Sequence, residues 1–213
     1  SFYERVIGLR AARHDDGLAY LFAEGDRPLM NLNETPGVQP FPKRGYAGLY
    51  HYAILVPDRK TLGLVLRNLI QHRVPIGSSD HLVSEALYLD DPDGHGIEIY
   101  ADRPRRLWNV SADGRVQMAV DPLDGESLLK ESEGAEWTGM PAGTTIGHVH
   151  LHVSDLREAE QFYHGVLGFD VTASMGKSAL FVSAGGYHHH LGLNIWAGEG
   201  VPAAPPDIAA LEY

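Results

Sequence analysis

Polar and apolar residues alternate over His148 to Val153, in the run HVHLHV. Successive side chains of a strand point to opposite faces, so the three histidines of this run share one face. Ser154-Asp155 follows as a helix N-cap signal, because a short side-chain oxygen can accept from the unpaired amides of the first turn. Apolar residues then recur at helical spacing up to Gly168, a typical helix end. The pattern predicts a strand, a helix and a second strand that begins at Phe169.

The same pattern recurs elsewhere in the chain. The N-terminal run SFYERVIGL matches QFYHGVLGF at residues 161–169. A third copy begins in the run LYHYAILVPD, where a histidine again precedes a capping aspartate by seven positions, at His51 and Asp58. Internal repetition of this kind indicates duplicated structural units. The sequence therefore predicts several βαβββ units of roughly 50 to 60 residues each.

The repeats divide the chain into three parts. Residues 1–110 are expected to form a first pair of units, of which the first lacks its opening strand and the second is complete. Residues 111–140 are interpreted as a connector without a functional site, with a strand over 116–120 and a short helix over 127–131. Residues 141–213 hold a third unit and the start of a fourth. The alignment and the missing initiating Met predict a chain clipped at both ends.

The fold class expected from these units is α+β. Tandem βαβββ modules would pair into cupped mixed sheets, with the first and last modules incomplete in this chain. Within each module the strands carry the alternating pattern, and one helix covers the apolar face.

The amino-acid composition limits the kinds of partner that the chain is expected to bind. The formal net charge of -11 argues against nucleic acid and anionic membranes, because both attract clustered Lys and Arg. The chain has no Cys, so any metal must be held by His, Asp or Glu. No run approaches the roughly 18 apolar residues of a membrane span. A cytoplasmic protein that binds small molecules is the expectation, and homo-oligomerisation stays open.

His51 and Glu98 are the first candidates for chemistry. Glu98 stands between Ile97 and Ile99 in the run GIEIY, so its side chain points away from two apolar ones. A single glutamate of this kind commonly faces solvent. Inside a cup, however, an ionised carboxylate is costly unless it is paired or bound to a metal. Two imidazoles and one carboxylate on one side of a ferrous ion leave positions open for substrate and oxygen.

Four runs of the sequence resemble the vicinal oxygen chelate superfamily of glyoxalases, extradiol ring-cleaving dioxygenases and bleomycin-resistance proteins. They are HYAILVPD, DPDGHGIEIY, HVHLHVSDL and FYHGVLGF, and they cover both halves of the chain. The run SAGGYHHHLGLN and the length of the repeat array resemble bacterial catechol-type extradiol dioxygenases most. The resemblance implies a metal in the cup, Fe(II) before Mn, Zn or Ni. It also implies a small aromatic substrate and O2.

The resemblance also implies roles for individual residues. His51 and Glu98 match the metal ligands of the second module of a pair, whose third ligand would come from the absent opening strand of the first module. His148 matches a metal ligand of the other pair. Tyr213 stands where that other pair would need a further histidine, so His51 and Glu98 rank above His148 as ligands.

The run YHHH supplies the remaining candidate. His189 matches the histidine that acts as acid or base beside the metal in the dioxygenases, with His188 and His190 close behind. An imidazole can accept and return a proton near neutral pH, which suits the removal of a catechol proton. A solvated turn would explain the same run. If the run were a strand, His189 would point away from its two neighbours.

Two other functions remain open from the sequence. A glyoxalase-type isomerase that uses zinc or nickel would draw a second carboxylate from a first-type module, where this chain has Asn31 and Gly192. A metal-free protein that binds an aromatic drug or metabolite would suit the acidic charge, together with Trp108, Trp137 and Trp196.

Overall fold

The computed structural model describes residues 1–13 and 17–210, so Tyr213 lies outside the described residues. Eight strands of this part form one mixed sheet in the order β5-β6-β7-β4-β8-β11-β10-β9. The second unit supplies β4 (Gly48–Leu55), β5 (Gly77–Asp80), β6 (Ser84–Asp90) and β7 (Gly96–Asp102), and the third supplies β8 (Thr145–His152), β9 (Asp170–Met175), β10 (Ala179–Ser183) and β11 (Leu191–Asn194). Each unit thus contributes four consecutive strands of the sheet.

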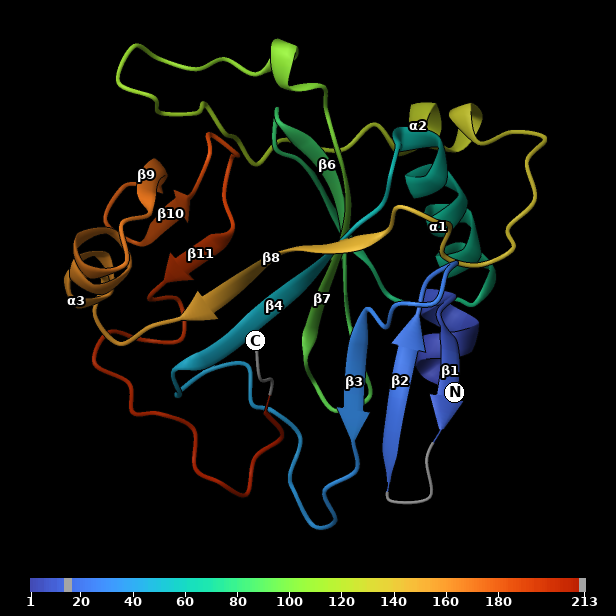
Figure 1. Ribbon diagram of the computed structural model, residues 1–213, viewed down its shortest axis with the longest axis horizontal. Helices are drawn as coiled ribbons and strands as arrows, with labels where there is room; N and C mark the ends of the chain where they lie inside the picture. The colour runs from blue at the N-terminus through green and yellow to red at the C-terminus, as the bar shows by residue number, and fades with distance from the viewer. Residues whose placement is uncertain (14–16, 211–213) are drawn as a thin grey trace.

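The two units meet where β4 pairs antiparallel with β8, at the centre of the molecule (Figure 1). On its other side β4 pairs parallel with β7, and β8 likewise pairs parallel with β11. The strand order is therefore the same in both units when each is followed outward from the β4·β8 pair. The expected α+β class, with tandem units joined in a curled mixed sheet, is confirmed.

The first unit forms a separate sheet. Its turn of π-helix η1 (Tyr3–Ile7) precedes β1 (Arg10–Arg13), β2 (Leu18–Phe22) and β3 (Met30–Asn33), which pair in that order. The sequence analysis placed the first and second units in one cup, whereas the sheet joins the second unit to the third. Both edges of β4 are already occupied, by β7 and β8, so no edge remains for the first unit. The division of the chain at residues 110 and 140 stays a prediction.

Helix α1 (Arg59–Gln71) covers the apolar face of the second unit. It begins at Asp58, whose carboxylate accepts from the amide of Thr61 at 2.7 Å, as the capping signal predicted. Its buried side chains, among them Leu62 and Leu69, join the core that contains Ile97 and Ile99. Glu98 therefore faces the opposite side of the sheet, away from this core.

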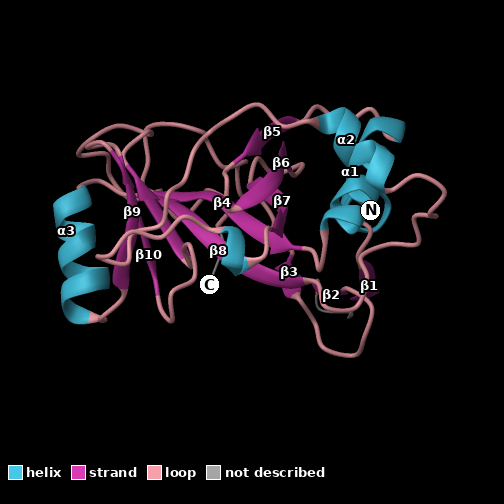
Figure 2. Ribbon diagram, turned by 90° about the horizontal axis from the view of Figure 1, so that it is seen from above, coloured by secondary structure: helices cyan, strands magenta, loops and turns pink. Residues whose placement is uncertain are grey.

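The α-helices lie at the two ends of the molecule. Figure 2 shows α1 and α2 (Gly125–Glu131) at one end and α3 (Leu156–Glu160) at the other, with the strands between them. Helix α3 continues as the π-helical turn η3 (Gln161–Val166), and a 3-10 turn η2 (Arg105–Leu107) lies between β7 and the connector. Over residues 1–13 and 17–210, no helix combines the length and apolarity that crossing a bilayer demands.

The connector follows the prediction only in part. The short helix expected over 127–131 is confirmed as α2. The strand expected over 116–120 is wrong, because Val116 makes a single isolated bridge, to Val110. Residues 116–120 lie beside the eight-stranded sheet and contribute no strand to it. The amide of Val116 donates to the carbonyl of Thr172, a residue of β9.

Gly96 marks a close approach between β7 and β4. A Cβ at Gly96 would lie 2.2 Å from the carbonyl oxygen of Tyr50, a backbone atom that cannot move aside cheaply. We expect Gly96→Ala to lower the free energy of unfolding by about 1–3 kcal/mol, measured by urea denaturation. Gly77→Ala is the matched control, since its Cβ would meet Tyr88 at an ordinary 3.6 Å. Equal urea midpoints for the two variants would contradict the close approach.

Candidate metal centre

Strand register brings three polar side chains together over one small residue. Ala53 of β4 pairs with Glu98 on β7 and with His148 on β8, so these side chains flank it on the same face of the sheet. His51 lies two residues before Ala53 on the same strand and therefore also faces this side. Ala53 itself is fully buried, and its side chain is a single methyl group. His51, Glu98 and His148 converge beside this residue and are called the triad below.

The triad has the geometry of a ligand set. Nε2 of His51 lies 2.9 Å from Oε2 of Glu98, and Nε2 of His148 lies 3.1 Å from the same oxygen. One ligand atom from each residue lies within 4.8 Å of the other two. Two imidazoles and one carboxylate match the donor set that non-haem Fe(II) proteins use.

An unpaired nitrogen in the triad supports its fit to a metal ion. Nε2 of His51 is buried and makes no hydrogen bond, although it lies close to Glu98, because the contact is not aligned for one. Buried polar atoms without partners are rare and costly. A cation between the imidazole and the carboxylate would satisfy both groups at once.

The protonation states also suit a cation. Burial alone would raise the pKa of Glu98, but the adjacent His148 and His51 outweigh it and hold this pKa well below its usual range. Burial lowers the pKa of His148 from its ordinary value, and the attraction of Glu98 offsets this only in part. The triad near neutral pH is therefore an ionised carboxylate beside a neutral imidazole, the forms that bind metals.

A cavity of about 550 Å³ opens beside the triad. His51 and Glu98 border it, and aromatic rings form much of its wall: Tyr50, His150, Phe181, Trp196 and His189. Residues 115–120 of the connector border it as well, although the sequence analysis expected no part of a site there. The cavity has the size and lining of a site for a small aromatic molecule.

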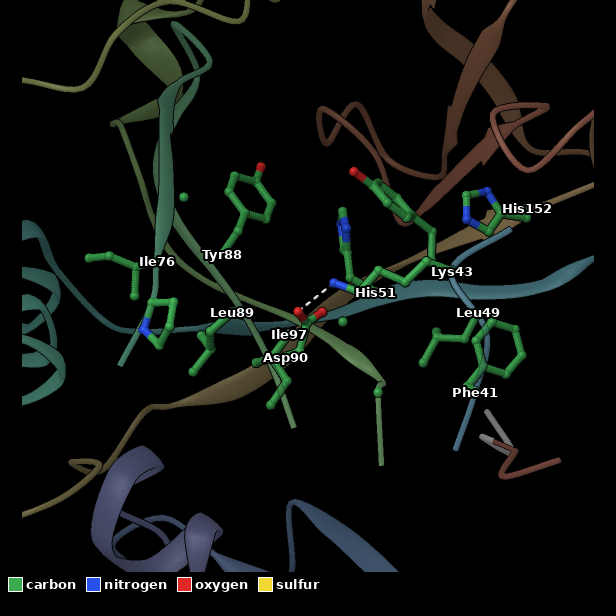
Figure 3. Close-up of a pocket in the computed structure, with 15 residues that line it drawn as sticks. Phe41, Lys43, Leu49, His51, Ile76, Tyr88, Leu89, Asp90, Ile97 and His152 are labelled. Carbon is green, nitrogen blue, oxygen red and sulfur yellow. Dashed lines mark hydrogen bonds and ion pairs between the residues drawn. The ribbon is translucent and has the colours of Figure 1, made fainter. Parts of the chain in front are cut away.

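A second cavity, of about 380 Å³, adjoins the first through the shared residues Tyr50, His51, Gly77 and Tyr88. Figure 3 shows Lys43 reaching across this cavity to an ion pair with Asp90. Its other walls are mainly apolar. His51 and Tyr88 therefore stand between the two cavities and border both.

His189 lies beside the triad. Its ring centroid is 4.1 Å from that of His148, and its side chain borders the larger cavity. Burial, followed by the neighbouring His148 and His188, holds the pKa of His189 well below its ordinary value. His189 is therefore a neutral imidazole near pH 7, which can accept a proton. Its role as acid or base stays a prediction.

The run YHHH is neither a strand nor a solvated turn. Residues 187–190 end the loop between β10 and β11, and the side chains of His188 and His189 are both buried. The side chain of His190 turns away to Ser183, with Nδ1 3.1 Å from its hydroxyl. Strand alternation therefore does not describe this run, because its backbone is not extended throughout.

The grouping of the ligands differs from the expectation. The sequence analysis assigned His148 to a different cup from His51 and Glu98 and reserved a third ligand for an absent strand. In the structure His148 completes the cluster with the other two. The physical reason is the β4·β8 pairing, which places the opening strands of the second and third units side by side.

Sequence reasoning missed two residues at the cavity. Tyr88 is paired with Glu98 across the β6·β7 ladder, and its hydroxyl lies 2.6 Å from Nε2 of His81. Burial, followed by the charge of Glu98, raises the pKa of Tyr88 well above its ordinary value, so the phenol stays protonated. The alternation of residues 84–90 could have indicated Tyr88, whereas His81 lies in a turn that carries no such pattern.

The family described as the Glyoxalase/Bleomycin resistance protein/Dioxygenase superfamily matches residues 1–99 and 145–202 of the chain. A catechol-2,3-dioxygenase of Bacillus subtilis (strain 168) is 53% identical over 213 residues, which are 100% of this chain and 75% of that protein. Both matches include His51, Glu98 and His148.

Solved structures resemble the chain at the level of the fold. A V278E mutant of glyoxalase I from Zea mays has a TM-score of 0.50 and 17% identity, over 93% of this chain and 63% of that one. The Mn(II)-bound glyoxalase from Novosphingobium aromaticivorans has a TM-score of 0.38 and 19% identity, and the chain spans 55% of its length. Together with the family match and the Bacillus relative, the curled sheet of repeated units shows that the chain belongs to the glyoxalase/bleomycin resistance protein/dioxygenase superfamily.

Proposed function

We propose that the chain is a metal-dependent extradiol dioxygenase that cleaves a catechol-type aromatic ring with O2. The observation that carries the proposal is the convergence of two histidines and one glutamate beside a cavity lined with aromatic rings. The 53% identity to a catechol-2,3-dioxygenase supports the same reaction class. The proposed metal is Fe(II), held by His51, Glu98 and His148, because this donor set leaves open positions on one side of the ion.

The chain's own residues would prepare the substrate. The chemistry that ferrous iron supplies when bound there is transfer of electron density between an aromatic diol and dioxygen. The rings of Tyr50, Phe181 and Trp196 would hold the planar substrate by stacking and edge contacts. His189, as a neutral imidazole, would take a proton from a substrate hydroxyl, and the protonated phenol of Tyr88 would donate a hydrogen bond to a substrate oxygen.

The glyoxalase-type alternative has less support. It would draw a second carboxylate from Asn31 or Gly192, and neither residue has one. Asn31 lies on β3 in the separate three-stranded sheet, and Gly192 lies against the ring of His150. Among the described residues the triad contains a single carboxylate. Zinc or nickel with isomerase activity, or a metal-free protein that binds aromatics, would be distinct outcomes of the first experiment.

The ligand assignment predicts the metal content of variants. We expect His51→Ala, Glu98→Ala and His148→Ala each to abolish iron retention by anaerobically purified protein. The loss should exceed the roughly 10- to 100-fold weakening that follows removal of a residue merely hydrogen-bonded to a ligand. His164→Ala, at an exposed histidine, is the control and should keep the iron content of the wild type. A triad variant with full iron and catechol turnover, seen as a yellow ring-opened product, would refute the assignment.

Ala53 predicts a second change in metal binding. Ala53→Val adds two methyl groups beneath the triad, between Glu98 and His148, and should reduce iron content. Overpacking costs about 1–3 kcal/mol of stability at such a buried site. Ala101→Val is the matched control, because Ala101 is equally buried but belongs to the core on the other face. We expect the two variants to lose comparable stability, but only Ala53→Val to lose iron. Equal iron contents in the two variants would contradict the placement of the ion.

The proposed role of His189 predicts a loss of turnover without loss of metal. We expect His189→Ala to lower kcat for catechol by roughly 100- to 10,000-fold, the range that general acid–base groups contribute. Its iron content should stay that of the wild type, since His189 is not assigned as a ligand. The adjacent His190→Ala should keep kcat close to that of the wild type. Similar kcat values for the two variants would remove His189 from the mechanism.

A further inference from the structure

Strand β7 carries a second carboxylate on the face that holds Glu98. Glu98, Tyr100 and Asp102 alternate along this strand, so their side chains share one face. Glu98 belongs to the triad, and the Tyr100 hydroxyl lies 2.7 Å from that of Tyr187. Asp102 has no part in the proposed reaction, yet its side chain points toward the same group of histidines.

Asp102 is linked to His189 through His188. Oδ1 of Asp102 lies 2.9 Å from Nε2 of His188, and Nδ1 of His188 lies 2.7 Å from Nδ1 of His189. His188 is completely buried, whereas the side chain of Asp102 keeps 25% of its surface exposed. The link therefore runs from the end of β7 to the His189 ring, which packs against His148 at a tilt of 50°.

The ring of His188 is held firmly. Its carbonyl oxygen accepts from the hydroxyl of Thr172 at 2.5 Å, which fixes the backbone. The ring of Tyr187 lies 4.0 Å from the His188 ring and that of Trp108 lies 5.2 Å from it, measured between centroids. The indole nitrogen of Trp108 in turn donates to the carbonyl of Arg103, next to Asp102. These contacts leave the imidazole of His188 little freedom to rotate away from Asp102.

Donor and acceptor rules then fix the direction of the link. A carboxylate only accepts hydrogen bonds, so Nε2 of His188 must be the protonated nitrogen. With His188 in the form that carries a single N–H, its Nδ1 accepts, and Nδ1 of His189 donates to it. Nε2 of His189 is consequently the nitrogen that carries the lone pair.

We propose that Asp102 and His188 are positioning residues that hold His189 in the Nδ1–H tautomer, with Nε2 free to accept a proton. Their part in turnover rests on the proposed function. When a substrate hydroxyl gives up its proton, the O–H bond breaks and an N–H bond forms at Nε2 of His189. The Nδ1–H bond to His188 is kept throughout, so the ring does not need to turn.

The test is the tautomer of His189, read by imidazole ¹H–¹⁵N correlation NMR on the zinc-loaded full chain, with kcat and KM for catechol measured on the iron-loaded chain. In the wild type we expect the Nδ1–H pattern. Asp102→Ala and His188→Leu should lose this pattern and lower kcat about 10- to 100-fold, less than the loss expected for His189→Ala, with little change in KM.

Conservative variants separate positioning from packing. His188→Gln can donate to Asp102 through its amide nitrogen and accept from His189 through its oxygen, so it should restore the Nδ1–H pattern and most of kcat. Asp26→Asn removes a carboxylate from an exposed bend between β2 and β3 and should match the wild type in both readouts. Thermal unfolding confirms that each variant is folded before the comparison.

Failure of the positioning role and failure of the proposed function give different results in these measurements. If folded Asp102→Ala and His188→Leu keep the Nδ1–H pattern and kcat, or if His188→Gln is no better than His188→Leu, the positioning role is overturned. If the tautomer changes as expected but the iron-loaded wild type opens no catechol ring, the proposed function fails while the hydrogen-bonded link stands.

Discussion

The antiparallel pairing of β4 with β8 is the contact on which the site depends. It joins the opening strands of two repeated units, and each of these strands is paired on its other side with the closing strand of its own unit. Side chains that are far apart in the sequence thus become neighbours across ladder hydrogen bonds. A change of register by one residue would turn the whole polar set to the core face, so the hydrophobic face of the sheet fixes the position of the triad.

Burial of Glu98 sets the electrostatics of this region. With 3% of its surface exposed, the carboxylate has lost most of its hydration and depends on the two imidazoles for compensation. Burial also lowers the pKa of His148 and of the nearby His150, so these two imidazoles are disfavoured as cations. A cluster of this kind has one negative charge and several neutral nitrogen donors near neutral pH. The cluster is therefore suited to a divalent cation, because its neutral imidazoles do not balance the negative charge of Glu98.

The two faces of β7 have different roles in the second unit. Ile97 and Ile99 bind the sheet to α1, while Glu98, Tyr100 and Asp102 face the histidine cluster. The loop between β10 and β11 then brings His188 and His189 from the third unit to meet this polar face. The site is consequently assembled from both units, and the main core likewise contains residues of both.

Several features followed from the sequence alone. The period-two pattern around Glu98 and the capping aspartate at Asp58 determined a strand and a helix, because both depend on neighbours within a few residues. The repeat determined the βαβββ units for the same reason, and His51 and Glu98 could be selected as a pair. The grouping of His148 with His51 and Glu98 could not be predicted, since strand pairing between units depends on which sheet edges remain open. The direction of His188 and the approach of Tyr88 and residues 115–120 to the cavity were likewise decided by tertiary structure, because loops and turns carry no periodic signal.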